Sequence, residues 1–175
     1  MFEISKDEIL SRLKSLDEDA SLLFDDSESF TLIIVGGGAL ILQEYIARST
    51  HDIDVISVSE PLRNLLERHD INCPLLAYLD TFSDGYESRA ALIFKGERIA
   101  FFTAALEDII IAKLHAMRDT DKLDIEAGSI RNELDWELLD TLAKNIEESS
   151  LNERRYREFR YYYDDYVRRF RPCGS

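Results

Sequence analysis

Residues 32–57 have the sequence LIIVGGGALILQEYIARSTHDIDVIS. An apolar run ends in three glycines, a short helical pattern follows, and two aspartates then alternate with apolar residues in a second apolar run. Glycine has no Cβ, so the backbone at Gly36 to Gly38 can approach a ligand closely. This order predicts a strand over 32–35, a phosphate-binding turn, a helix over about 39–46 and a second strand over 51–58.

The two aspartates of this stretch are candidate metal ligands. Side chains alternate along a strand, so Asp52 and Asp54 share one face while Ile53 and Val55 point into the core. The two carboxylates lie roughly 6–7 Å apart along the strand. Mg²⁺ typically binds through one or two carboxylates together with substrate phosphates, and Mn²⁺ suits the same ligands. The alternative is a solvated strand end without a metal.

The glycines also have alternatives. A dinucleotide-binding fingerprint aligned on Gly36 and Gly38 needs a third glycine at position 41, which is Ile41. The chain also lacks a repeated β-α-β pattern, so that interpretation is rejected. A tight strand-to-helix turn without a ligand stays open beside the phosphate-binding turn, where helical N–H groups would face the phosphate.

Two motifs resemble a known family. A double glycine at a helix start, followed by R-x-T-x-D-x-D, is similar to the nucleotidyltransferase superfamily, with matches at Gly37, Gly38, Arg48, Thr50, Asp52 and Asp54. Residues 106–126, LEDIIIAKLHAMRDTDKLDIE, resemble a downstream signature of AbiEii-like and related minimal nucleotidyltransferases. The matching positions there are Lys113, Leu114, Ala116, Arg118, Asp119, Asp121 and Asp124.

This resemblance implies an α+β (α/β-like) fold in which helices flank a small mixed sheet. It implies a Mg²⁺-dependent transfer of a nucleotide from an NTP to an RNA or protein acceptor. The setting it suggests is bacterial or phage-related, with a toxin–antitoxin partner or a defence module. By resemblance, Asp52 and Asp54 are catalytic metal ligands, and Lys113 and Asp121 are further catalytic residues. The nucleotide would contact Gly37, Gly38, Arg48 and Thr50.

The second motif has structural alternatives as well. Lys113 lies on an apolar helical face, where a lysine either extends its amine to solvent or reaches into a site. Asp119, Asp121 and Asp124 suit a helix N-cap and a solvated turn as well as a further acidic ligand. A third metal-binding carboxylate on a later strand is common in the superfamily. The predicted hairpin over 89–102 offers only Glu97, beside a Lys95-Gly96 turn.

The remaining chain predicts a body over 1–118 that includes the sheet and a helical extension over 119–175 on the same core. Ser5 with Glu8 and Ser150 with Glu153 have the spacing of capping boxes, and Asp135 precedes another helical pattern. Glu60 to His69 is also predicted to be helical. Neither a signal-peptide pattern nor a membrane-spanning run is present. With only two cysteines, a reduced cytoplasmic setting is expected.

The C-terminal segment differs from the rest in charge. Residues 152–171 hold seven arginines against four acids, a balance of +3, in a chain of net charge −14, so the remainder carries −17. Aromatic residues recur at helical spacing, at Tyr156, Phe159, Tyr163, Tyr166 and Phe170. This predicts a terminal helix that packs its aromatics on the body or in a homodimer. An RNA- or base-binding helix and a flexible tail are the alternatives.

Two functions follow from these patterns. The favoured one is the nucleotidyltransferase, because both glycines and the D-x-D pair are intact. The alternative is a degenerate nucleotidyltransferase fold that binds a partner without catalysis, because a third acid is not evident.

Overall fold

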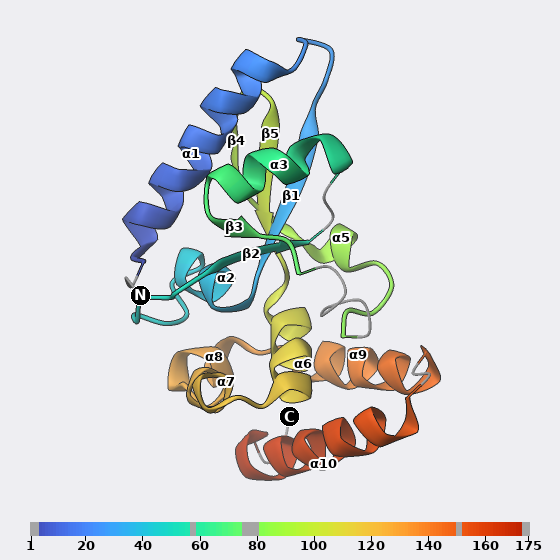
Figure 1. Ribbon diagram of the computed structural model, residues 1–175. Coiled ribbons are helices and arrows are strands. Elements are labelled where there is room, and N and C mark those ends of the chain that lie inside the picture. Colours follow the sequence, from blue (N-terminus) through green and yellow to red (C-terminus); the bar gives the residue numbers. More distant parts are fainter. Residues whose placement is uncertain (1–3, 57–58, 75–80, 150–151, 173–175) are drawn as a thin grey trace. The chain divides into compact units, whose positions relative to one another are not determined.

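The computed structural model describes residues 4–56, 59–74, 81–149 and 152–172. The chain forms two compact units, one of residues 1–76 with 87–105 and one of residues 77–86 with 106–175 (Figure 1). A five-stranded mixed sheet lies in the first unit, and the second is helical, which confirms the α+β class. The helix over 106–116, predicted to be part of the body, belongs to the second unit.

The sheet of the first unit contains β1 (Phe30–Val35), β2 (Ile53–Ile56), β3 (Ile71–Asn72), β4 (Ala91–Lys95) and β5 (Ile99–Thr103). Its strand order is β3-β2-β1-β5-β4. The central strand β1 runs antiparallel to β2 and parallel to β5. Strands β4 and β5 form the predicted hairpin, and the short β3 pairs in parallel with β2 at one edge.

Helices α1 (Lys6–Leu23), α2 (Gly36–Leu42) and α3 (Glu60–Arg68) pack on this sheet, and α1 contacts both of the others. The capping box at the start of α1 is confirmed, because Ser5 and Glu8 bond each other's backbone N–H groups. The predicted helix after the glycines is displaced: it begins at Gly36, not at residue 39. It ends at Leu42 because Glu44 adopts a left-handed φ of 64°.

Asp17 ties α1 to the hairpin. Its buried carboxylate accepts backbone N–H bonds from Glu97, Arg98 and Ile99 at 2.7–2.9 Å. A Cβ at Gly96 would lie 2.2 Å from this carboxylate, so only glycine fits there. Glu97 therefore sits in the turn of the hairpin, as the sequence predicts, and its backbone is held by Asp17.

The second unit contains α6 (Leu106–Ala116), α7 (Asp119–Ile125), α8 (Gly128–Glu133), α9 (Trp136–Ser149) and α10 (Glu153–Phe170), and the short α5 (Tyr86–Arg89) spans the boundary between the units. Helix α6 contacts α7, α9 and α10. Phe159 stacks on His115 at 4.1 Å, and the Tyr166 hydroxyl donates to the Ile125 carbonyl at 2.8 Å. The predicted aromatic stripe of α10 thus packs inside this unit.

Two predicted caps in the second unit have different outcomes. Asp135 caps α9 as expected, accepting N–H bonds from Glu137 and Leu138 at 3.0 Å. Ser150 lies outside the described residues, and the N-cap of α10 is Asn152, which accepts from the Arg155 N–H at 3.1 Å. No helix among the described residues has the length and apolar character to cross a membrane.

Candidate functional site

Strand pairing brings Asp54 beside the glycine turn. In the antiparallel register of β1 and β2, Asp54 lies opposite Val35, the last residue before Gly36. The carboxylate is therefore one strand away from the point where β1 ends and the glycines begin. Residues separated by nearly twenty positions in the sequence form one local cluster as a result.

The two predicted ligands lie at the start of β2, Asp52 just before the strand and Asp54 within it. Ile34 pairs with Val55, and both are fully buried, whereas Asp54 is partly exposed and Asp52 is exposed. A Cβ on Gly38 would lie 3.7 Å from the Ile34 side chain, so α2 begins over the Ile34 face. Asp54 lies on the opposite face, since side chains alternate along a strand, and Asp52 lies just before the strand. The neighbours of Asp54 on that face are buried, namely Ile33, Val35 and Ile56.

The glycine turn is in contact with the segment that precedes β2. Gly36 has a φ of 65°, which favours glycine. A Cβ at Gly37 would lie 3.1 Å from Nη2 of Arg48 and 3.4 Å from Oγ1 of Thr50. The guanidinium of Arg48 therefore lies directly on the Gly37 backbone, and its Nη1 donates to the Ser49 carbonyl at 2.7 Å. The turn combines close backbone access with a fixed positive charge.

Thr50 holds this segment in place. Its hydroxyl donates to the Asp52 carbonyl at 3.1 Å, and its backbone exchanges two hydrogen bonds with Ile4. The side chain of Thr50 is buried. These contacts hold the backbone immediately before Asp52. The antiparallel bridge between Thr50 and Ile4 therefore positions the residue that carries the first carboxylate.

A further residue, Asn72, orients the second carboxylate. Asn72 is the partner of Asp54 in the parallel pairing of β3 with β2, and its side-chain amide donates to Asp54 Oδ1 at 3.3 Å. Sequence reasoning missed Asn72 because β3 is a two-residue strand just before Pro74, with no periodic signal.

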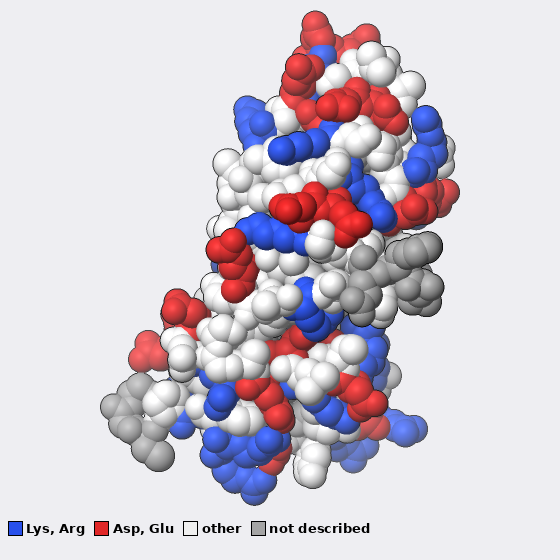
Figure 2. Space-filling view, turned by 90° about the vertical axis from the view of Figure 1, so that its left-hand side faces the viewer, with Lys and Arg blue, Asp and Glu red and all other residues white. Residues whose placement is uncertain are grey.

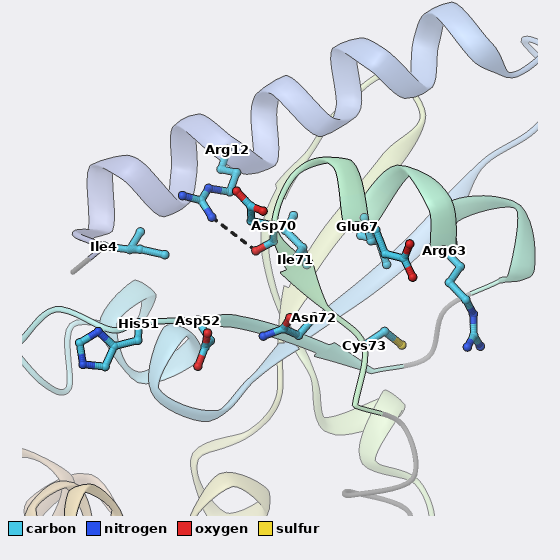
Figure 3. Close-up of a pocket in the computed structure, with 11 residues that line it drawn as sticks. Ile4, Arg12, His51, Asp52, Arg63, Glu67, Asp70, Ile71, Asn72 and Cys73 are labelled. Carbon is cyan, nitrogen blue, oxygen red and sulfur yellow. Dashed lines mark hydrogen bonds between the residues drawn. The ribbon is translucent and has the colours of Figure 1, made fainter. Parts of the chain in front are cut away.

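A cleft of about 580 Å³ opens at the β3 edge beside Asp52 (Figure 3). Its walls combine arginine, acidic and apolar side chains. The arginine Arg12 donates to the Asp70 carbonyl at 3.4 Å, and Arg63 pairs with Glu60 at 3.3 Å. The lining residues are Ile4, Arg12, His51, Asp52, Arg63, Leu66, Glu67, Asp70, Ile71, Asn72 and Cys73. Its volume lies in the range of small-molecule sites.

The donor set fits a hard cation that shares its ligands with a substrate. The described residues contain no group of three or more His, Cys, Asp or Glu side chains placed to hold a metal. Asp52 and Asp54 supply two carboxylates two positions apart in the chain, and Mg²⁺ usually takes only one or two from the protein. The pair therefore suits Mg²⁺ bound jointly by protein, water and phosphate.

The other two predicted catalytic residues lie in the second unit and pair with each other. Lys113 Nζ lies 2.7 Å from Asp121 Oδ1 and 2.8 Å from Asp124 Oδ2, and all three side chains are buried. Arg118 adds a bond of 2.8 Å to Asp121. The expected solvated turn is therefore wrong for Asp121 and Asp124, which face α6 from the first turns of α7.

This network shifts the acidity of Asp121. Burial alone would raise the pKa of the Asp121 carboxyl, but hydrogen bonds from Arg118 and Lys113 outweigh burial and lower that pKa. The carboxylate is thus held ionised by two cations. The network joins the end of α6 to α7. A lysine at position 113 and aspartates at positions 121 and 124 therefore have a structural role in connecting the two helices. A catalytic role for Lys113 and Asp121 stays a prediction.

The structure thus brings together six of the predicted site residues in the first unit: Gly37, Gly38, Arg48, Thr50, Asp52 and Asp54. Comparison with curated proteins and with solved structures found no match. A family model described as "Nucleotidyltransferase of unknown function (DUF6036)" matches residues 11–171. This match covers both motifs and nearly the whole chain. The chain belongs to this nucleotidyltransferase family.

Proposed function

We propose that the protein is a Mg²⁺-dependent enzyme that transfers a nucleotide from an NTP to an RNA or protein acceptor. The observation that carries this proposal is the β1–β2 register, which sets Asp54 beside the Gly36–Gly38 turn on which Arg48 lies. A polyphosphate needs close backbone approach and positive charge, while the metal that accompanies it needs carboxylates. All of these lie at the end of β1.

Each group has a distinct task in this proposal. Arg48 and the backbone of Gly37 and Gly38 would hold the phosphates, because a guanidinium forms paired hydrogen bonds with phosphate oxygens. Asp52 and Asp54 would hold the metal, with Asn72 fixing the orientation of Asp54. Mg²⁺ bound there would neutralise charge on the phosphates as it develops during displacement.

The reaction is an in-line displacement at the α-phosphorus. A bond forms between an acceptor oxygen and that phosphorus, the bond to the bridging oxygen breaks, and pyrophosphate leaves. The acceptor oxygen loses its proton to water. Catalysis of this kind rests mainly on positioning and charge stabilisation.

The cleft beside Asp52 suits the nucleoside better than the triphosphate. Besides Asp52, the proposed metal ligand, two arginines (Arg12 and Arg63) and two acids (Glu67 and Asp70) line it, and the apolar Leu66 also contributes to the wall. A neutral base and ribose tolerate such mixed walls, whereas a triphosphate would be repelled by the two carboxylates. At the glycine turn, the side chains nearest a Cβ at Gly37 are those of Arg48 and Thr50.

The direct test is a transfer assay. The native chain is incubated with each α-³²P-labelled NTP and with cellular RNA or protein as acceptor, in Mg²⁺, in Mn²⁺ or in chelator. We expect metal-dependent labelling that both Asp52→Asn and Asp54→Asn abolish. Glu18→Gln, an exposed position on α1, makes the same charge change and should leave labelling intact. Labelling that survives both aspartate variants would contradict the proposal.

One observation favours the alternative of a non-catalytic binding module. Within the described ranges, no third carboxylate joins Asp52 and Asp54, and Glu97 is held in the hairpin turn. Such a module would act through a partner, such as the toxin or antitoxin that the family resemblance suggests. It predicts no metal-dependent NTP binding and a loss of partner capture when the chain is truncated before Asn152, whereas the enzyme predicts both NTP binding and transfer.

A further inference from the structure

We propose that the solvent-facing side of α10 is a docking surface for single-stranded RNA. The proposal concerns the second unit alone and does not depend on the transfer reaction. It starts from a division of α10 into two faces. Phe159, Tyr163 and Tyr166 are buried and form the inner face.

The outer face carries a stripe of arginine and tyrosine. At about 100° per residue, Arg154, Arg157, Tyr161 and Arg168 fall within an arc of about 60° opposite the buried aromatics. The stripe extends over about 21 Å along the helix. Tyr161 is 72% exposed, and the Arg154 and Arg168 side chains are 84% and 78% exposed. We call these four residues the outer stripe.

The charge of this helix is opposite to that of the chain. Residues 152–171 carry +3, whereas the rest of the chain carries −17. Figure 2 shows Lys and Arg side chains on the surface of the helical unit, with Asp and Glu side chains among them. A polyanion is attracted to this helix and repelled by the acidic remainder of the chain, so charge favours binding at α10.

The arginines of the stripe can exchange their present partners for phosphates. Arg154 pairs with Glu158 at 3.2 Å and Arg168 pairs with Asp165, both on the helix surface. Exposed pairs of this kind contribute little stability. Within the parts of the chain that the structure describes, Arg157 makes no ion pair at all.

Tyr161 favours a nucleic acid over an acidic protein segment, because its exposed ring can stack with a base. Tyr161 meets Tyr162 edge-on, at 5.5 Å between ring centroids and 72° between planes, which leaves the exposed Tyr161 ring open to a stacking partner. Aromatic rings between arginines are typical of single-strand binding, where bases stack and phosphates pair. Single strands with splayed bases are the form in which RNA is usually recognised through stacking.

The test is the fluorescence anisotropy of a short labelled single-stranded RNA, in the absence of NTP and divalent metal. We expect binding that weakens with salt. The variant Arg154→Gln/Arg157→Gln/Arg168→Gln should lower the slope of log K against log salt by about 2, one phosphate being lost per arginine. Tyr161→Ala should weaken binding about tenfold, and Tyr161→Phe should restore it, because stacking needs only the ring.

Matched controls separate the stripe from general charge effects. Arg68→Gln removes an exposed arginine from α3 in the first unit and should leave the affinity unchanged. Far-ultraviolet circular dichroism and the unfolding midpoint establish that each variant is folded. Because NTP is absent, failure of RNA binding leaves the transfer proposal standing, and failure of transfer leaves this one standing.

Several results would overturn the inference. One is a native chain that does not bind the RNA at low salt. Others are a stripe variant with native affinity, or an Arg68→Gln variant that loses as much affinity as the stripe variant. An RNA affinity that Tyr161→Ala leaves unchanged would point to an acidic protein partner instead. An equal affinity for single-stranded DNA would show that the surface does not select RNA.

Discussion

The side-chain amide of Asn72 donates a hydrogen bond of 3.3 Å to Asp54 Oδ1 across the paired strands β3 and β2. This contact restricts the orientation of the Asp54 carboxylate through its Oδ1 atom. Residues that orient a metal ligand typically alter metal affinity by 10–100-fold when removed. Asn72 thus connects the edge of the sheet to the proposed chemistry.

We expect Asn72→Ala to weaken Mg²⁺-NTP binding by about tenfold or more, since Asp54 loses its orienting donor. The free energy of unfolding should change by less than about 1 kcal/mol, because Asn72 is exposed. Isothermal titration and urea unfolding measure the two effects. Asn64→Ala, at an exposed position of α3, is the control. Equal affinities for native and Asn72→Ala would rule out this orienting role.

Gly37→Ala should impair nucleotide binding while leaving the fold intact. The new Cβ would lie 3.1 Å from Arg48 Nη2, so the end of this flexible side chain must move by a few tenths of an ångström. The free energy of unfolding should change by less than about 1 kcal/mol, because alanine suits a helix better than glycine. Gly128→Ala, with only Arg131 Nη2 nearby at 3.9 Å, is the matched control. Undiminished NTP affinity in Gly37→Ala would speak against a phosphate at this turn.

Lys113→Met should destabilise the second unit by about 3–5 kcal/mol, because it leaves Asp121 and Asp124 buried with fewer cations. Lys122→Met removes an exposed pair with Asp119 at 3.3 Å and should cost less than about 1 kcal/mol. Urea unfolding compares the two variants. A Lys113→Met chain that is stable but inactive would instead assign Lys113 to catalysis.

The same network predicts a dependence of stability on pH. The pKa of Asp121 is lowered in the folded chain, where burial is outweighed by bonds from Arg118 and Lys113. Its contribution to stability is therefore fully present above the ordinary pKa of 3.8 and is lost as pH falls through the lower folded value. The free energy of unfolding of the native chain and of Asp121→Asn is measured from pH 7 down into this acid range. The difference between the two free energies should become smaller as the pH falls.

A control variant tests whether the pH dependence of the free energy of unfolding comes from Asp121. Asp119 is exposed, and its pairing with Lys122 is on the surface. The free energy of unfolding of Asp119→Asn should change with pH in the acid range as that of the native chain does. A difference between native and Asp121→Asn that stays constant with pH would show that the network, as described, does not hold the Asp121 carboxylate ionised.

Much of the candidate site could be predicted from local sequence, because its parts are close along the chain. The strand before Gly36, the alternation of Asp52 and Asp54, and the hairpin over 89–102 depend on patterns within a few residues. The helix start was misplaced because glycines were expected to form a loop before the helix. In the structure the triplet forms the first turn of α2, after the extended Val35.

Contacts between distant residues could not be predicted in the same way. Asp17 binds the hairpin turn eighty positions away, and nothing in its own helix marks it for this contact. Lys113 had two open interpretations because its partners, Asp121 and Asp124, become neighbours only when α7 folds back on α6. Pairing of buried charges depends on tertiary packing, which periodicity does not encode.

The central claim is that Asp52 and Asp54 form a metal-dependent nucleotide site beside the glycine turn. Isothermal titration of each NTP into native, Asp54→Asn and Glu18→Gln chains, with and without Mg²⁺, tests it most directly. Baseline stabilities are compared separately, since removing one of two neighbouring like charges can itself stabilise the fold. The account predicts Mg²⁺-dependent NTP binding by the native and Glu18→Gln chains that Asp54→Asn loses. Absence of binding by the native chain, or equal binding by Asp54→Asn, would contradict it.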